Sequence, residues 1–447
     1  MKKIFFTFFV SLFLFTNISI SEAIFSWSGE GSGIESDPFQ IENCERLQSI
    51  SEVVESGYYF ILNNDIDCSM TNPNNSNWDS EGLWAEGIGF YPLGGNSRNP
   101  FFGYFDGNNK KIKNLYINRP DPNLSGDAND LTGLFGYVGS DSEIKNVYLT
   151  EANITGVNQL TGGLVGSNFE STIKNSYVSG SITGGEYTGG LVGYNLGHIE
   201  NSYTKGTVNG SNNVGGLVGQ SSPPLASTVK NSYSEASVSG IENVGGLIGK
   251  NYQDSVINSY STGVVQGNNA VGGFIGHLFY NYGATCSDYV SNSGWLKNQE
   301  NISLETFGEI KTSEMFVGIV DGNCNDVNIY IETDKSNFYS KNHGVYAIGT
   351  EDAWDFSSPI WYEWNNKLPL FEEQIIPKTR TRSSGSSASA IASFQKEQIE
   401  KAKENLPSPK ITPPVLSRII RMTIPRTIGE DVLAFQKYLN SIGYNVG

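Results

Sequence analysis

The segment TGGLVGYNLGHIENSYTKGTV, residues 188–208, joins a glycine-rich run to a short stretch that contains Asn-Ser-Tyr. Near-copies of its first part begin at residues 131, 161, 214, 244 and 271, so successive units start 30, 27, 26, 30 and 27 residues apart. A second segment follows each start at a nearly fixed offset: IKNVY (144–148), IKNSY (173–177), IENSY (199–203), VKNSY (229–233) and VINSY (256–260). This period is typical of solenoids, in which each unit buries its apolar face against its neighbours.

The second segment has the two-residue alternation of a strand with one covered face. Ile199, Asn201 and Tyr203 share one parity, whereas Glu200 and Ser202 share the other. Helices are disfavoured because glycine pairs recur in five of the six units and Val, Ile, Thr and Tyr dominate between them. We therefore predict an all-β fold, a right-handed parallel β-helix in which each unit forms one coil.

Equivalent side chains of such a fold should stack, since neighbouring coils lie about 4.8 Å apart. The stacking predicts an internal amide ladder and a parallel aromatic stack, and the ladder would satisfy amides that are costly to bury. The residues concerned are Asn146, Asn175, Asn201, Asn231 and Asn258 for the ladder, and Tyr148, Tyr177, Tyr203, Tyr233 and Tyr260 for the stack. The paired glycines suit corners where the backbone turns sharply or passes close to a neighbouring coil.

The combination of G-G-L-V-G with I-x-N-S-Y resembles the GLUG motif of bacterial secreted and surface proteins. That family includes adhesin-like proteins and the non-catalytic region of immunoglobulin A metalloproteases. The flanks DPFQIENCERLQSI (37–50) and WDFSSPIWYEWNNKLPLF (354–371) are also similar to segments of such proteins, so the resemblance covers roughly residues 30–372. The resemblance implies a surface or adhesin-like role and implies no activity.

Protease activity of the related metalloproteases depends on a His-Glu-x-x-His helix, which this sequence does not contain. Its three histidines are His198, His277 and His343, and their spacing does not form the motif. We expect His198 to be a solvated loop residue and not a ligand.

The expected organisation begins with a secretory signal over residues 1–23, with Lys2, Lys3, an apolar run and Ser21-Glu22-Ala23 as the cleavage site. An uncleaved membrane anchor is the alternative, although the apolar run is short and interrupted. The remaining regions are an N-terminal cap with the first rungs (24–130), GLUG repeats (131–277), an insertion with a closing rung (278–372), a linker (373–414) and a C-terminal segment (415–447). We expect a secreted or cell-surface protein with no membrane contact after signal cleavage.

The charge of the chain limits its partners. A formal net charge of −17 and a pI near 4.7 argue against nucleic acid and anionic membrane surfaces, both of which require basic patches. Extracellular glycans, other proteins and cell-wall peptidoglycan remain as expected partners.

Four cysteines in an exported chain suggest two disulfides, and arithmetic allows three pairings. We favour Cys44–Cys68 and Cys286–Cys324 because each pair lies within one non-repeat region; free thiols are the alternative. We expect a capping helix over residues 43–55, with Asn43 as its N-cap, to cover the open end of the solenoid. The Cys44–Cys68 disulfide would tie this helix to the first strands. The aromatic residues of segment 71–100 are expected to pack over this end, with a sugar-stacking surface as the alternative.

The final segment, TIGEDVLAFQKYLNSIGYNVG (427–447), resembles the first helix of a peptidoglycan-binding domain. The matching positions are Gly429, Asp431, Val432, Phe435, Gln436, Leu439, Asn440, Gly443 and Tyr444. Pro425 stands where a glycine is usual, and such domains contain about three helices. The resemblance implies a wall tether; a plain amphipathic helix is the alternative.

One metal site is conceivable in DGNCNDVNIYIE (321–332), where Asp321, Asn323, Asn325 and Glu332 occupy positions 1, 3, 5 and 12 of a calcium loop. Asp326 stands where that loop needs glycine, so an Asx-rich turn is the alternative. No other cofactor is expected.

Two functions remain open at this point. The leading one is a non-enzymatic spacer or adhesin-like module. The second is a polysaccharide lyase or glycoside hydrolase. Its carboxylates would come from segments 71–130 and 278–352, because the repeats hold almost no carboxylates at recurring inward or groove positions.

Overall fold

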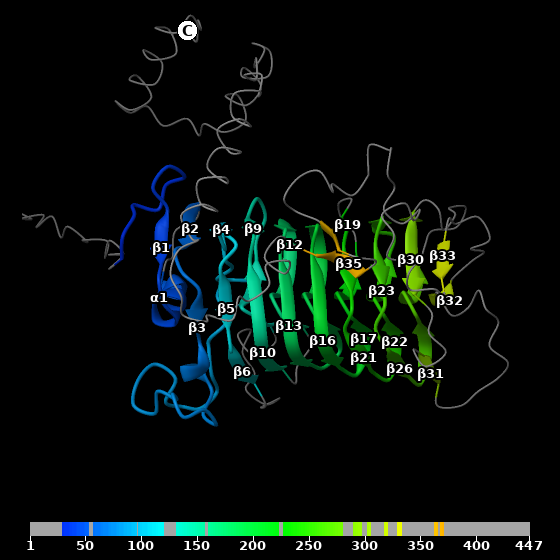
Figure 1. Cartoon of the computed structure of the whole chain (residues 1–447), viewed down its shortest axis with the longest axis horizontal. Helices are drawn as coiled ribbons and strands as arrows, with labels where there is room; N and C mark the ends of the chain where they lie inside the picture. Colours follow the sequence, from blue (N-terminus) through cyan, green and yellow to red (C-terminus); the bar gives the residue numbers. More distant parts are fainter. Residues whose placement is uncertain are drawn as a thin grey trace, which may run out of the picture. The chain divides into compact units, whose positions relative to one another are not determined.

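The computed structural model describes residues 29–52, 57–95, 97–119, 131–156, 160–222, 227–279 and 289–296, and the strand segments 302–304, 317–320, 329–332, 362–364 and 367–370. The chain divides into two compact units, Met1–Pro377 and Lys378–Gly447, and the described residues all lie in the first. This part is an all-β parallel solenoid, as predicted, whose strands succeed one another from β1 to β33 (Figure 1). No described helix is long and apolar enough to cross a membrane.

Three parallel sheets form the sides of the solenoid among the described residues. The first contains β1 (Phe39–Ile41), β2 (Tyr58–Leu62), β4 (Gly103–Asp106), β8 (Phe135–Val138), β9 (Glu143–Lys145), β12 (Val165–Lys174), β15 (Val192–Glu200), β18 (Val218–Ser221), β19 (Thr228–Lys230), β23 (Ile248–Tyr252), β24 (Ser255–Ile257), β28 (Ile275–Phe279), β29 (Val290–Ser291) and β32 (Val317–Val320). The second contains β3 (Ile66–Asp67), β5 (Lys111–Lys113), β6 (Tyr116–Arg119), β10 (Tyr148–Gly156), β13 (Tyr177–Thr183), β16 (Tyr203–Asn209), β20 (Tyr233–Ser234), β21 (Ser237–Ser239), β25 (Tyr260–Ser261), β26 (Val265–Gly267), β30 (Ser293–Leu296), β31 (Ile302–Leu304) and β33 (Ile329–Glu332). The third contains β7 (Leu131–Thr132), β11 (Leu160–Gly162), β14 (Tyr187–Gly189), β17 (Asn212–Gly215), β22 (Glu242–Gly245) and β27 (Asn269–Gly272).

Strands continue the solenoid beyond residue 277, where we expected an insertion. β30 pairs with β25, β32 with β28 and β33 with β30, all in parallel. The buried Trp295 takes part in this extension although no GLUG pattern marks it. Within the expected closing rung, β34 (Tyr362–Trp364) and β35 (Lys367–Leu370) form a separate antiparallel pair.

Repeat equivalence explains the core, because the register places like residues against like. Ile173 pairs with Ile199, and Val192 pairs with Val218. Buried columns therefore run along the inside of the solenoid, for example Leu164, Leu191, Leu217 and Leu247 at one corner. Each unit alone would leave these side chains exposed, and stacking removes them from water.

The glycines of the GGLVG segments are required by close backbone approach and not by a left-handed conformation. A Cβ on Gly163 would lie 2.3 Å from the carbonyl oxygen of Gly190 in the next rung. A Cβ on Gly193, the third glycine of its unit, would lie 2.7 Å from the Gly166 oxygen and 2.8 Å from the Thr161 nitrogen. The first and third sheets therefore meet backbone to backbone at these positions, which only glycine permits.

Asparagine side chains connect the rungs at one corner. Asn175 donates to the Oδ1 atom of Asn146 at 3.3 Å, Asn201 to that of Asn175 at 3.2 Å, and Asn258 to that of Asn231 at 3.1 Å. Beside them the tyrosine rings of consecutive rungs stack with centroids 4.7 to 4.9 Å apart, from Tyr148 to Tyr260.

The structure differs from the expected alternation at the asparagines. All five ladder asparagines adopt the left-handed conformation, with φ between 48° and 55°, which asparagine tolerates better than most residues. The left-handed asparagine interrupts the strand. In the rung of Asn201, the side chain of Ser202 therefore points into the interior, and Asn201 is half-buried at the corner. Val178 belongs to the core, so its neighbour Tyr177 lies on the opposite face of the strand. The Tyr177 side chain is still buried there, with only 5% of it exposed.

A serine ladder follows from the same corner and was missed from the sequence. Each serine hydroxyl donates to the carbonyl two residues before it and accepts the backbone N–H of the equivalent residue in the preceding rung, as in Ser176 N to Ser202 Oγ at 3.2 Å. That equivalent residue is Val147 for Ser176 and a serine for the other members. The members are Ser176, Ser202, Ser232, Ser259 and Ser293. Burying these backbone groups is therefore compensated in every rung.

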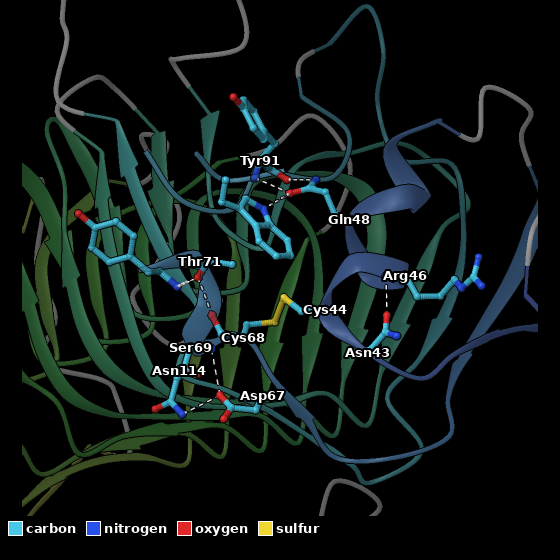
Figure 2. The surroundings of a disulfide bond; sticks show 12 residues. Asn43, Cys44, Arg46, Gln48, Asp67, Cys68, Ser69, Thr71, Tyr91 and Asn114 are labelled. Carbon is cyan, nitrogen blue, oxygen red and sulfur yellow. Dashed lines mark hydrogen bonds between the residues drawn. A yellow bond between two sulfur atoms is a disulfide. The ribbon is translucent and has the colours of Figure 1, made fainter. Parts of the chain in front are cut away.

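The N-terminal cap is held by the predicted disulfide Cys44–Cys68 (Figure 2). It joins helix α1 (Cys44–Gln48), which continues as the 3₁₀ turn η1 (Ser49–Glu52), to the residue preceding the 3₁₀ turn η2 (Ser69–Thr71). Asn43 is the N-cap, accepting from the Arg46 backbone N–H at 2.8 Å. Residues 53–55 of the expected helix lie outside the described residues, as does the pair Cys286–Cys324.

The aromatic loop after η2 largely packs on this cap. Trp84 and Phe90 are 1% and 0% exposed, and the Gln48 amide oxygen accepts from the Trp84 ring N–H and the Tyr91 backbone N–H. Tyr91 itself is 39% exposed. Packing therefore accounts for Trp84 and Phe90, and they are not available as a sugar platform.

Replacing a close-approach glycine should destabilise the solenoid far more than replacing an open one. Gly193→Ala forces two rungs apart, and we expect the free energy of unfolding to fall by about 1–3 kcal/mol or more. Gly95→Ala is the matched control, since a Cβ there meets nothing within 4 Å. Urea unfolding followed by circular dichroism measures both; equal stability of the two variants would contradict the close-approach account.

Removing the disulfide should loosen the N-terminal cap first. Its cysteines are separated by 24 residues, and closing such a loop contributes about 3 kcal/mol in the chain-entropy estimate. We expect the double variant Cys44→Ser, Cys68→Ser to lower the melting temperature and to expose the cap to limited proteolysis before the repeats. Cleavage that begins in the repeats would contradict this order.

Candidate functional site

The outer face of the first sheet carries a column of charged residues that register aligns from rung to rung. Its members are Asp106, Lys145, Lys174, Glu200 and Lys230. The Glu143 carboxylate forms ion pairs with Lys145 at 3.0 Å and with Lys174 at 2.5 Å. Burial raises the pKa of Glu143, but hydrogen bonds from Lys174 and Lys145 outweigh it and the net pKa is lowered. These charges neutralise one another and favour a solvated face.

The outer face of the second sheet carries two uncharged columns in its central rungs, next to the ion pair between Lys205 and Glu235. Ser181 aligns with Thr207 and Ser237, and two residues further on Thr183 aligns with Asn209 and Ser239. Hydroxyl and amide groups bond along the columns, from Thr207 to Ser181 at 3.2 Å and from Ser239 to Asn209 at 2.6 Å. The two sheets therefore present chemically different long faces.

A surface cavity of about 340 Å³ lies near the N-terminal end, at a corner of the first sheet. It spans three segments far apart in the sequence: Gly57, the stretch Phe102–Tyr104 and the turn Ser140–Ser142. Phe102 is 40% exposed and Asp141 is also exposed. Sequence reasoning missed this cavity. The adjacent pair Phe101-Phe102 was the signal for an exposed aromatic residue, because neighbours along a strand face opposite sides. Of the two, only Phe101 belongs to the core.

Two described carboxyl groups have a raised pKa, which is a property of many catalytic acids. Burial raises the pKa of Glu235, opposed by its ion pair with Lys205 at 3.0 Å. Burial raises the pKa of Asp254 to about 6, although hydrogen bonds from Ser221 and Ser227 act in the opposite direction. Neither residue lines the cavity, so their shifts mark buried structural positions.

Asp254 belongs to an interior polar column. Its backbone N–H donates to Asn251 Oδ1 at 3.1 Å, the Asn251 amide donates back to the Asp254 carbonyl at 3.0 Å, and its Oδ2 accepts from Ser221. In the preceding rungs Asn168 donates to Asn195, and Asn195 donates to Ser221. Asp254 Oδ1 has no hydrogen-bond partner among the described groups, so a charge here is poorly compensated.

The site residues expected from the sequence have different outcomes. His198 is exposed, as expected, but it lies in strand β15 and not in a turn, with Nδ1 3.0 Å from Thr228 Oγ1. Glu332 ends strand β33, whereas Asp321, Asn323 and Asn325 lie outside the described residues. No group of three or more His, Cys, Asp or Glu residues that could hold a metal occurs in the described part. The peptidoglycan-like positions 429–444 also lie outside it.

A sequence model of the GLUG motif matches residues 157–183, 184–209 and 240–266. The chain carries GLUG repeats. Similar sequences include halomucin of Haloquadratum walsbyi, 34% identical over 164 residues, and a protein named "Putative Gly-rich membrane protein" of Evansella cellulosilytica, 32% identical over 209 residues. These matches cover 36% and 40% of this chain but only 2% and 22% of those two proteins.

A solved structure supports the fold of the GLUG repeats. A crystal structure described as a "putative immunoglobulin A1 protease" from Bacteroides ovatus superposes with a TM-score of 0.50 at 19% identity. The match covers 76% of this chain and 94% of the other. At this identity the likeness concerns the β-solenoid alone.

The buried carboxyl group of Asp254 should make stability depend on pH in a defined direction. Its folded pKa of about 6 exceeds the ordinary value of 3.8, so folding favours the protonated form and this group's stabilisation is lost as pH rises from about 4 to about 6. We expect Asp254→Asn to raise the free energy of unfolding by about 1–3 kcal/mol at pH 7.5 and by almost nothing at pH 4. Urea titrations at both pH values check this; a variant that is less stable at pH 7.5 would contradict it.

Proposed function

We propose that this chain is a secreted or cell-surface β-solenoid that acts without catalysis, as an adhesin-like binding and spacer module. The observation that carries the proposal is the continuous stacking of GLUG repeats by backbone, asparagine and serine ladders. Such stacking holds long faces in a fixed arrangement, and extended surfaces of this kind are what solenoid proteins use for binding. Similarity to a protein named "Putative Gly-rich membrane protein" supports a surface location.

The C-terminal segment supplies the proposed attachment point. Its likeness to the first helix of a peptidoglycan-binding domain favours a tether to the cell wall, with the solenoid projecting side chains toward a glycan or protein partner. The acidic chain is compatible with these partners and unsuited to nucleic acid.

A polysaccharide lyase or hydrolase remains the second candidate, and the cavity is the observation that favours it. Its one carboxylate, Asp141, falls short of the two that glycoside hydrolysis usually needs, so we rank binding above catalysis.

Sedimentation with purified peptidoglycan sacculi tests the tether. We expect the full chain to sediment with sacculi and the variant Phe435→Asp, Leu439→Asp to lose at least about five-sixths of that binding, because both positions match the binding pattern. Gly95→Ala is the control for handling and folding. Equal sedimentation of parent and double variant would contradict the tether.

The same preparations distinguish binding from catalysis. We expect no release of reducing ends or unsaturated uronates from β-glucan, mannan or polygalacturonate. Product release that Asp141→Asn abolishes would support the enzyme instead.

A further inference from the structure

The cavity at the corner of the first sheet combines an aromatic wall with a polar rim. Phe102 directly precedes strand β4 and Tyr104 lies two residues further on within it; Phe101 and Gly103, the residues that alternate with them, are buried. Both aromatic side chains therefore project outward from the same rung. The next rung contributes Ser140 and Asp141 to the lining.

The aromatic rings are fixed in place by packing on one side. A Cβ on Gly139 would lie 2.1 Å from the ring of Phe102, so this ring rests against the glycine backbone. Tyr104 stacks on Tyr59 with centroids 4.3 Å apart and an interplanar angle of 13°. The remaining surface of Phe102, 40% exposed, is open to a ligand.

The polar groups at the rim are available. Ser142 is already used, since its hydroxyl accepts from the Gly103 N–H at 3.2 Å and donates to the Phe101 carbonyl at 3.3 Å. By contrast, no hydrogen bond to the side chain of Ser140 or Asp141 occurs within the described part of the chain. Asp141 is held in a left-handed turn, with φ of 60°, and its backbone N–H donates to the Glu170 carbonyl of the next rung at 3.3 Å.

We propose that this cavity binds one pyranose residue of a neutral extracellular glycan. A flat aromatic ring offers a face to the C–H groups of a sugar, while a hydroxyl and a carboxylate offer hydrogen bonds to its hydroxyl groups. The volume of about 340 Å³ falls at the small end of ligand sites and suits a single sugar unit with some water. The proposal rests on the proposed binding function and specifies its partner.

Charge selects neutral sugars over acidic ones. Asp141 lies at the cavity and the whole chain carries a net charge of −17, so a uronate or sialate would be repelled. A basic peptide is the competing ligand, because Asp141 and the aromatic rings would also attract a lysine side chain.

Affinity electrophoresis and calorimetry with the full chain test the proposal. The probes are soluble β-glucan, mannan and galactan, with polygalacturonate as the acidic glycan and oligolysine as the basic peptide. We expect retardation by at least one neutral glycan and none by polygalacturonate. Phe102→Ala should raise the Kd for that glycan at least about tenfold, and Asp141→Asn, which keeps a residue tolerant of the left-handed turn, by about fivefold.

Tyr91→Ala is the matched control. The exposed fraction of Tyr91, 39%, is similar to that of Phe102, 40%. Tyr91 lies in the N-terminal cap outside the cavity, so its replacement should leave the Kd unchanged. Circular dichroism confirms that each variant is folded.

Three outcomes would overturn the proposal: no retardation by any neutral glycan, unchanged affinity in Phe102→Ala, or binding of oligolysine alone with loss in Asp141→Asn. These outcomes are separable from failure of the proposed tether. Sedimentation with sacculi that persists in Phe102→Ala while its glycan affinity is also unchanged refutes the cavity alone. Glycan binding without sedimentation refutes the tether alone.

Discussion

Close contact between backbones at the repeat glycines is the constraint on which the rest of the structure depends. At Gly163 and Gly193 no Cβ fits between consecutive rungs or between the first and third sheets. Parallel strand pairing holds the rungs at one spacing, which only glycine tolerates at these positions, so every other equivalent position must also meet its own copy. The tyrosine stack, the asparagine ladder and the leucine columns are consequences of that one spacing.

In-register stacking lets a glycine-rich sequence with few large apolar side chains per repeat form a stable core. Polar residues replace part of the apolar core where the chain turns, and they do so without leaving backbone groups unpaired. Ser202 satisfies the N–H of Ser176 and at the same time bonds its own rung. Asp254 shows the limit of this arrangement, since its buried carboxylate bonds to the column of amides and hydroxyls through Ser221 and still remains partly unsatisfied.

The sequence was sufficient for features that repeat and insufficient for features that depend on backbone conformation or distant contacts. Repetition identified the strands and their register, and the separation of the non-repeat regions indicated Cys44–Cys68. The alternation rule failed at Asn201 because a left-handed residue resets which neighbour faces inward, and the rule assumes uninterrupted strand geometry. The cavity could not be found, since Gly57, Phe102 and Asp141 come together only through three successive rungs.

A location at the irregular end of the solenoid is what a specific binding site requires. Strict repeats place the same groups on every rung, so their surface offers many equivalent weak contacts and no singular one, as the aligned hydroxyls of Ser181 and Thr207 illustrate. The rungs around residues 57 and 102 precede the repeats, and where they meet the first repeat unit Phe102 is left outside, with Gly139 beneath it and Asp141 lining the same cavity. In the proposed binding function the regular rungs supply length and rigidity and the irregular rungs supply selectivity, so loss of either should impair binding in a distinguishable way.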